Sequence, residues 1–172
     1  MGMQKALGQE NIIVGEEISS SQGDIIGLFL TEEIPPGMNA QDTIDAIKSQ
    51  NGLVYIPHPF EKVRTSMQID VLGAVADDVD IIEGFNGRAL THRQTKTAIS
   101  WAKERSIPLA ASSDAHGYKG LGRCYTNILN LPTRENLVLE LQNGSPVFSR
   151  PPFYTLLYPK INRFKNALRG RI

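Results

Sequence analysis

The stretch LVYIPHPF, residues 53–60, decides the fold of this chain, because an unbroken apolar run ends there in two prolines around a histidine. A short apolar run before such a breaker is typical of a strand buried on both faces. Similar runs at 79–83 and 108–111 also end in polar or glycine-containing turns, and helical patterns at 66–77 and 90–105 lie between the runs. Strands that alternate with helices predict an α/β fold with a mainly parallel sheet.

Further strand-length apolar runs lie at 12–14, 24–30 and 125–129, and helices are predicted near 40–51 and 133–143. The total is five or six strands in 172 residues. A closed eight-stranded α/β barrel takes about 250 residues. The chain is therefore predicted to be an incomplete barrel or an open α/β sheet. A partial barrel has unpaired edges, which another chain or a second copy would cover.

Composition excludes several classes of protein. Lys and Arg total 18 and Asp and Glu total 18, and the zero net charge argues against a globally basic nucleic-acid binder. The single cysteine, Cys124, rules out an internal disulfide and fits the reducing cytoplasm, which is the predicted location. No apolar run approaches the roughly 18 residues needed to span a bilayer.

Polar residues of the kinds that bind metals stand where the predicted strands end: Glu17, His58, Asn86, Asp114 and His116. In parallel α/β folds, ligands gather at the carboxyl ends of strands. Each residue also has an ordinary interpretation: a packed loop histidine, a turn asparagine, or an aspartate that caps a helix. It is the joint pattern that indicates a site for Zn, Mn or Fe, which accept carboxylate, imidazole and amide ligands.

The motifs VGEEIS, GDIIGLF, GLVYIPHPF, DIIEGFNGR and PLAASSDAH occur in this order over residues 11–144. The series resembles the PHP family, named for polymerase and histidinol phosphatase, a set of metal-dependent phosphoesterases. The pair IPHPF and SDAH at this spacing is specific, whereas either motif alone would be weak.

The resemblance implies a distorted (β/α)7 TIM-like barrel that holds up to three metal ions. Glu17 matches the bridging glutamate of a Gly-x-Glu pattern, and His58 matches the ligand of the His-Pro motif. Asp114 and His116 match the final Asp-x-His pair. Asn86 stands where family members often place Cys, His or Asn.

The resemblance also implies a reaction. Metal-activated water would hydrolyse a phosphate ester, and Arg64 and Arg88 match positions that could bind the substrate phosphate. The expected substrate is a phosphorylated small molecule or a nucleotide.

The departure from the family pattern bears on activity. The His-x-His motif, a further Asp or His, and the Asp-His pair that family members carry before the Gly-x-Glu motif are not in this sequence. We therefore expect an incomplete metal site with at most five ligands. Two interpretations stay open: an upstream segment completes a phosphoesterase, or the chain is a non-catalytic metal-binding or protein-interaction module.

The sequence divides into a PHP-like domain at 1–148 and a basic tail at 149–172. No acidic residue follows Glu140, and apolar residues recur at helical spacing at Leu157, Ile161, Phe164 and Leu168. Such a helix could contact a membrane surface or nucleic acid. The favoured expectation is that its apolar stripe packs on the domain or on a partner chain.

Overall fold

The computed structural model describes residues 12–61, 65–89, 92–150 and 152–169. A five-stranded sheet has the order β1-β2-β3-β4-β5, and a two-stranded sheet pairs β6 with β7. The strands are β1 (Gly15–Ser20), β2 (Gly23–Leu28), β3 (Leu53–Ile56), β4 (Ile81–Asn86), β5 (Leu109–Ser112), β6 (Cys124–Asn127) and β7 (Ser145–Phe148). The structure is thus a mixed α/β fold.

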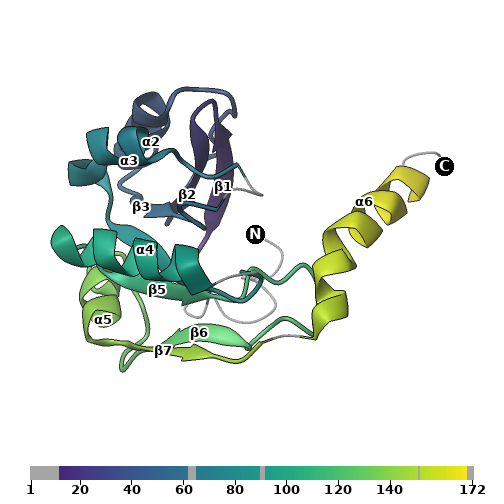
Figure 1. Cartoon of the computed structure of the whole chain (residues 1–172). Coiled ribbons are helices and arrows are strands. Elements are labelled where there is room, and N and C mark those ends of the chain that lie inside the picture. Colours follow the sequence, from purple (N-terminus) through teal and green to yellow (C-terminus); the bar gives the residue numbers. More distant parts are fainter. Residues whose placement is uncertain (1–11, 62–64, 90–91, 151, 170–172) are drawn as a thin grey trace.

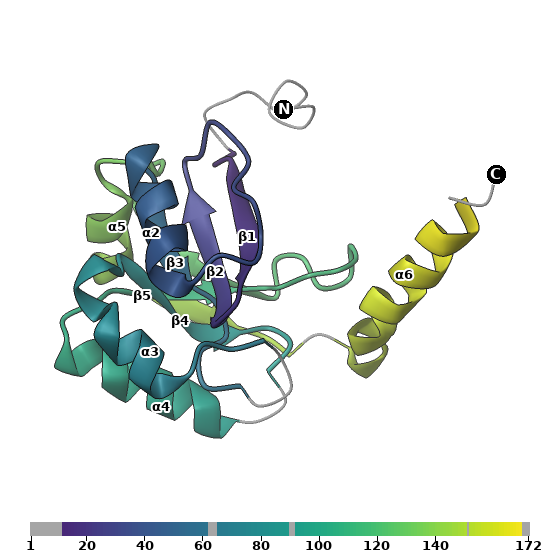
Figure 2. The ribbon, with the colours of Figure 1, turned by 90° about the horizontal axis from the view of Figure 1, so that it is seen from above.

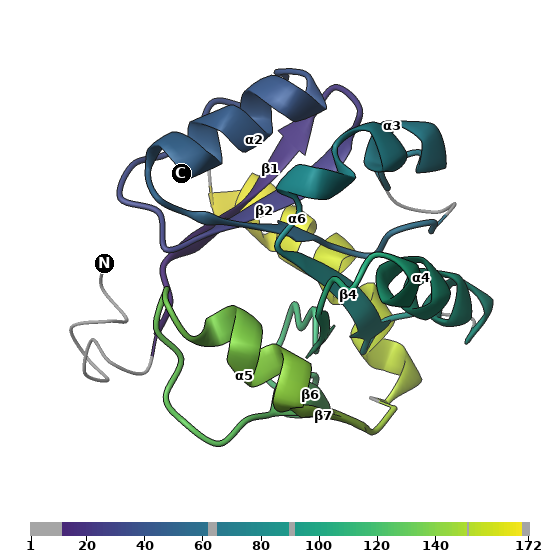
Figure 3. The same cartoon turned by 90° about the vertical axis from the view of Figure 1, so that its left-hand side faces the viewer.

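Five α-helices and two short 3-10 helices lie within the described residues. They are α2 (Ala40–Ser49), α3 (Ile69–Ala74), η2 (Ala76–Asp78), α4 (His92–Glu104), α5 (Leu137–Asn143), η3 (Phe153–Leu157) and α6 (Tyr158–Arg169). Figure 3 shows α2, α3 and α4 beside one another on the outside of the strands. No helix in the described part of the chain is long and apolar enough to cross a membrane.

The sheet is parallel only in its second half. β3 pairs with β4, and β4 with β5, in parallel, whereas β1 and β2 form an antiparallel hairpin and β2 is antiparallel to β3 (Figure 2). Only two residues, Ser21 and Gln22, connect β1 to β2, and a parallel crossover needs a dozen or more. The predicted mainly parallel sheet is therefore confirmed only for β3, β4 and β5.

The main core lies between the sheet and the three helices α2, α3 and α4. Its fully buried members include Ile44 and Ile47 from α2, and Leu72 from α3. Burying one such side chain contributes about 1.5–3 kcal/mol. A second, smaller cluster covers the opposite face of the sheet, where Leu137 of α5 packs with Leu53, Tyr55, Ile81 and Ala110.

The tail forms the predicted helix, but this helix projects away from the sheets (Figure 1). Leu157, Ile161 and Phe164 are 53%, 40% and 68% exposed, so these three residues do not pack on the domain. Packing of the stripe on a partner chain stays a prediction. The side chain of Leu168 lies outside the described residues. The helix does contact the loop after β5, because Nδ2 of Asn162 donates to the carbonyl oxygen of His116 at 2.8 Å.

Candidate functional site

Two carboxylates and one imidazole meet at the hairpin end of the sheet. Glu17 of β1, Asp24 of β2 and His58 after β3 each place a ligand atom within 4.8 Å of the others, and we call these three residues the Glu17 cluster. Nε2 of His58 lies 3.2 Å from Oε1 of Glu17. The His58 side chain is only 6% exposed and that of Glu17 is 54% exposed. The cluster is therefore buried at His58 and open to solvent at Glu17.

The hairpin register explains how this cluster forms. Ser19 pairs with Asp24 across the hairpin, and side chains two apart on a strand share a face, so Glu17 and Asp24 lie on the same face. The prediction that Glu17 follows the first strand is wrong, because β1 begins at Gly15 and places Glu17 within it. Sequence reasoning missed Asp24. Recognition of the two-residue hairpin would have found it.

Charge is concentrated in the Glu17 cluster. Burial raises the pKa of Asp24 above its ordinary value, a hydrogen bond from Ser19 opposes the rise, and the negative charge of Glu17 adds to it. A divalent cation would relieve this repulsion, and two carboxylates with an imidazole are a donor set that Zn, Mn and Fe accept. The residues therefore fit a metal ion.

The backbone of His58 has a left-handed φ of 32°, an uncommon conformation for a side chain of this size. Hydrogen bonds hold both of its peptide groups: the His58 amide donates to Oε2 of Glu83 at 2.6 Å, and Oγ of Ser66 donates to the His58 carbonyl oxygen at 2.7 Å. Such a conformation persists only where the surrounding structure imposes it. Glu83 and Ser66 thus position the imidazole.

Glu83 is a buried carboxylate in the middle of β4, and it is 4% exposed. Four groups donate hydrogen bonds to it: the Tyr55 hydroxyl at 3.1 Å, the His58 amide, Nδ2 of Asn86 at 2.9 Å, and the Ser112 hydroxyl. Burial raises its pKa and the hydrogen bonds from Ser112, Asn86 and His58 oppose the rise. Sequence reasoning missed Glu83, although an acid that directly follows the apolar pair Ile81-Ile82 within a predicted strand was a signal.

A second group of polar side chains lies at the ends of β4 and β5. We call Asn86, Arg88, Asp114 and His116 the Arg88 cluster. Nη1 of Arg88 lies 3.6 Å from Oδ1 of Asp114 and 3.2 Å from Nδ1 of His116. Because a guanidinium can only donate, Nδ1 of His116 is the acceptor in that contact. Nδ2 of Asn86 donates to Oδ2 of Asp114 at 3.1 Å.

The Arg88 cluster differs from the site that the sequence predicts. The side-chain oxygen of Asn86 accepts from the Arg88 amide at 2.7 Å, so the amide nitrogen, which cannot bind a metal, points to Glu83 and Asp114. The five predicted ligands are thus divided between two clusters, and Glu83 lies between them. Arg64 lies outside the described residues, so its position relative to either cluster is left as a prediction.

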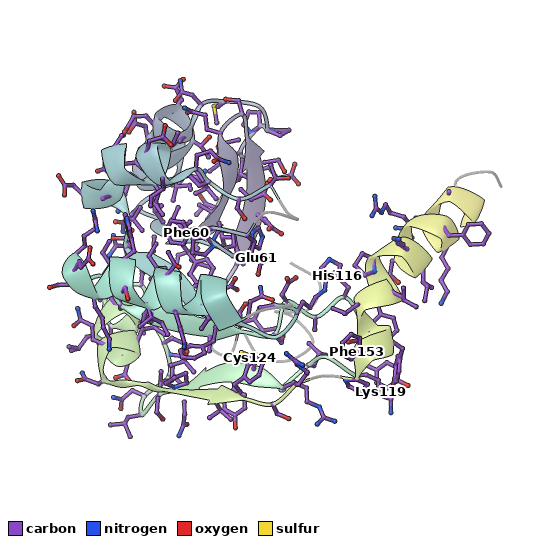
Figure 4. The ribbon with its side chains drawn as sticks, in the orientation of Figure 1. Phe60, Glu61, His116, Lys119, Cys124 and Phe153 are labelled. Atoms are coloured by element: carbon purple, nitrogen blue, oxygen red, sulfur yellow. The ribbon has the colours of Figure 1, made fainter. Side chains whose placement is uncertain are left out.

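Cys124, the single thiol, takes no part in either cluster's contacts. It is 2% exposed, and burial raises its pKa to about 11. Figure 4 shows it at the two-stranded sheet, away from His116. A thiol with so high a pKa is a poor nucleophile near neutral pH.

Several known proteins are similar to this chain. Residues 92–146 match the family model described as PHP-associated. The uncharacterized protein MJ0417 of Methanocaldococcus jannaschii is 34% identical over 123 residues, which are 69% of this chain and 52% of that protein. MJ1587 of the same organism is 34% identical over 84 residues, or 49% of this chain and 48% of that protein. The chain spans about half the length of these curated relatives.

Two solved structures share the fold. A two-domain protein from Bacteroides vulgatus, described as containing a predicted PHP-like metal-dependent phosphoesterase, matches with a TM-score of 0.61 at 20% identity, over 86% of this chain and 47% of that one. PsfC from Pseudomonas syringae matches with a TM-score of 0.58 at 17% identity, over 91% and 65%. The match of residues 92–146 to this family model, together with the shared fold, supports the identification of this chain as similar to the C-terminal part of PHP-family proteins.

Proposed function

We propose that this chain forms part of a metal-dependent phosphoesterase site, with a divalent ion held by Glu17, Asp24 and His58. The observation that supports this proposal most directly is that the ligand atoms of the three residues lie within 4.8 Å of one another. When bound, a divalent ion supplies Lewis-acid chemistry, which polarises a phosphoryl oxygen and lowers the pKa of a water ligand. The two carboxylates and the imidazole do not discriminate among Zn, Mn and Fe.

Other residues of the chain would position His58 and bind the substrate phosphate. Glu83 and Ser66 hold the backbone of His58, which fixes the imidazole at the floor of the site. Arg88, on the other side of Glu83, would bind the phosphate of the substrate, because a guanidinium matches phosphate geometry with two parallel hydrogen bonds. Asp114 and His116 orient this guanidinium through their contacts with Nη1.

A second candidate function is metal binding without turnover, in a module that serves protein interaction. It is favoured by the division of the predicted ligands, since three potential ligand residues of the described part of the chain meet in the Glu17 cluster and Asp114 is paired with Arg88. Catalytic zinc sites use three protein ligands and an open position, so three ligands suffice to bind one ion. An assay of turnover separates the two candidates.

We also propose that the open edge of the sheet is covered by another chain or by a second copy. β1 is the outermost strand in the sheet order, and an uncovered edge favours pairing with another strand. Sedimentation of the purified chain over a range of concentrations tests this part of the proposal.

The experiment is a calorimetric titration of the full chain with Mn²⁺, followed by assays with p-nitrophenyl phosphate and bis-p-nitrophenyl phosphate. We expect one Mn²⁺ per chain, and a loss of affinity of at least about tenfold in His58→Ala and in Asp24→Asn, because even outer-shell changes cost this much. Turnover that His58→Ala abolishes would favour the enzyme over the binding module.

A matched control is Glu16→Gln. Glu16 stands beside Glu17 and loses the same charge, but its Oε2 accepts a hydrogen bond from the Ile34 amide at 3.0 Å, which a glutamine oxygen can replace. Its Mn²⁺ affinity should match that of the unaltered chain. Equal Mn²⁺ binding by unaltered chain, His58→Ala and Asp24→Asn would refute the proposed site.

A further inference from the structure

The first residues of the tail close a small cavity beside the Arg88 cluster. Arg150, Phe153, Thr155 and Leu156 line it together with Arg88 and its two neighbours in the chain, and its volume is about 30 Å³. A water molecule needs roughly 10–15 Å³ on the same measure, so there is room for a small polar group but not for a whole nucleotide.

The charged side chains that line the cavity are both basic. Two arginines line it, and no acidic residue is among the described residues that do so. Nε of Arg88 is buried and has no hydrogen-bond partner within the described part of the chain. The same guanidinium reaches His116 and Asp114 through Nη1, so Arg88 stands between the cavity and those two residues.

The wall that the tail supplies is held in place at both ends. Oγ1 of Thr155, a residue only 4% exposed, donates to the Pro152 carbonyl oxygen at 2.7 Å and closes a turn. Further on, Asn162 binds the His116 carbonyl oxygen. Figure 4 shows Phe153 just before α6, on the side of the molecule where the loop bearing His116 lies.

We propose that this cavity binds the phosphate group of a phosphomonoester whose alcohol part is aromatic, with Arg88 and Arg150 as the phosphate ligands and Phe153 as the contact for the ring. Paired guanidinium groups bind phosphate through charge-assisted hydrogen bonds. Phe153 is 72% exposed, so it offers a ring face at the mouth, where a flat group can stack. This assignment rests on the proposed phosphoesterase function and names its substrate class.

Binding of inorganic phosphate tests the first half of the assignment. Titration of the full chain with phosphate, in buffer that contains a chelator, measures the cavity without metal. We expect Arg150→Gln to weaken phosphate binding about tenfold, because it removes a hydrogen bond from a charged donor. The matched control Arg163→Gln removes the same charge from an exposed position on α6 and should stay within about twofold. Unchanged phosphate affinity in Arg150→Gln would overturn the assignment.

Phenyl phosphate tests the second half. The unaltered chain should bind phenyl phosphate more tightly than inorganic phosphate, and Phe153→Ala should abolish that preference while phosphate affinity is kept. The matched control is Tyr154→Ala, since Tyr154 is exposed and does not line the cavity. A preference that survives Phe153→Ala would refute the role of the ring. Circular dichroism of each variant verifies that it is folded.

The two proposals can fail separately. If Mn²⁺ does not bind the Glu17 cluster but phosphate binding depends on Arg150, the metal site is wrong and the cavity stands as a phosphate site. If Mn²⁺ binds and Arg150→Gln leaves the phosphate affinity unchanged, the phosphate assignment of the cavity is refuted and the metal site stands.

Discussion

The Glu17 cluster and the Arg88 cluster contain similar residues, each with a histidine and an aspartate, yet they are opposite in electrostatic character. In the Glu17 cluster two carboxylates face one imidazole, and the pKa of Asp24 is raised by burial and by its acidic neighbour. In the Arg88 cluster a guanidinium lies 3.6 Å from the aspartate. The Glu17 cluster lacks a positive charge to balance its two carboxylates, and a bound cation would supply one. The Arg88 cluster already contains a positive charge, the guanidinium of Arg88.

This difference shows why residue type alone does not define a metal site. Asp24 and Asp114 are the same side chain, but one repels its neighbour and the other is paired. The comparison can be tested on the metal-free chain, because the two clusters should respond to the same substitution with opposite signs. All four measurements that follow use urea unfolding in the presence of a chelator.

The largest effect is expected at Glu83, which accepts a hydrogen bond from one residue of each cluster, His58 and Asn86. Glu83→Gln should lower the free energy of unfolding by about 2–4 kcal/mol, because one glutamine oxygen cannot accept from the four donors that meet there and the rest are left unsatisfied. Glu104→Gln is the control, since the side chain of Glu104 is 70% exposed. Similar stabilities for the two variants would show that Glu83 does not join the clusters.

Asp114→Asn should lower the free energy of unfolding by about 1–2 kcal/mol. The neutral amide cannot form an ion pair with Arg88, whose side chain is only 18% exposed. Asp45→Asn, on the exposed face of α2, loses the same charge and should change the stability far less. A stabilising effect of Asp114→Asn would contradict the view that this cluster is internally balanced.

Asp24→Asn should have the opposite sign and raise the free energy of unfolding at neutral pH by less than about 1 kcal/mol, because solvent screens these partly exposed charges. The raised pKa means that the folded chain favours the protonated carboxyl, so the stability that Asp24 contributes falls as the pH rises through that pKa. Below the ordinary carboxyl pKa, the variant and the unaltered chain should be alike. The gain should vanish when Mn²⁺ replaces the chelator, and a gain independent of pH would argue against charge repulsion.

The smallest effect is expected outside both clusters. Phe164→Ser, on α6, should change the free energy of unfolding by less than about 0.5 kcal/mol, because Phe164 is 68% exposed. Leu72→Ser, in the core, serves as the contrast and should be strongly destabilising. A large loss with Phe164→Ser would mean that the stripe on α6 is buried against another surface in solution.

The sequence predicts the half of the fold that local patterns determine. Strands at 53–56 and 109–112 and the helix at 92–104 follow from apolar runs and helical spacing. The helix predicted at 133–143 begins only at Leu137, after a turn in which the amides of Thr133 and Asn136 each bind the other's side chain, at 2.7 and 3.3 Å. These features depend on neighbours in the chain.

What the sequence could not reveal depends on pairing between distant segments. The predicted candidate site included Glu17 and His58, and the structure brings them together, but Asp24 enters only through hairpin register. Asn86 was predicted as a ligand from its position, yet the orientation of its amide follows from Arg88 and Glu83. The direction of the tail helix likewise depends on contacts that helical periodicity does not describe.

The position of β1 at the edge of the sheet also bears on how the protein behaves in concentrated solution. Its sequence, GEEISS, places two adjacent glutamates on the strand to which a neighbouring molecule would add. Like charges on two approaching β1 edges repel, so a second copy could cover this edge only where the charges are screened or bound by a cation, whereas a partner chain with basic residues would be attracted to it. Glu17 would thus influence association as well as the proposed metal binding, and salts that screen or bind it would favour contact between molecules.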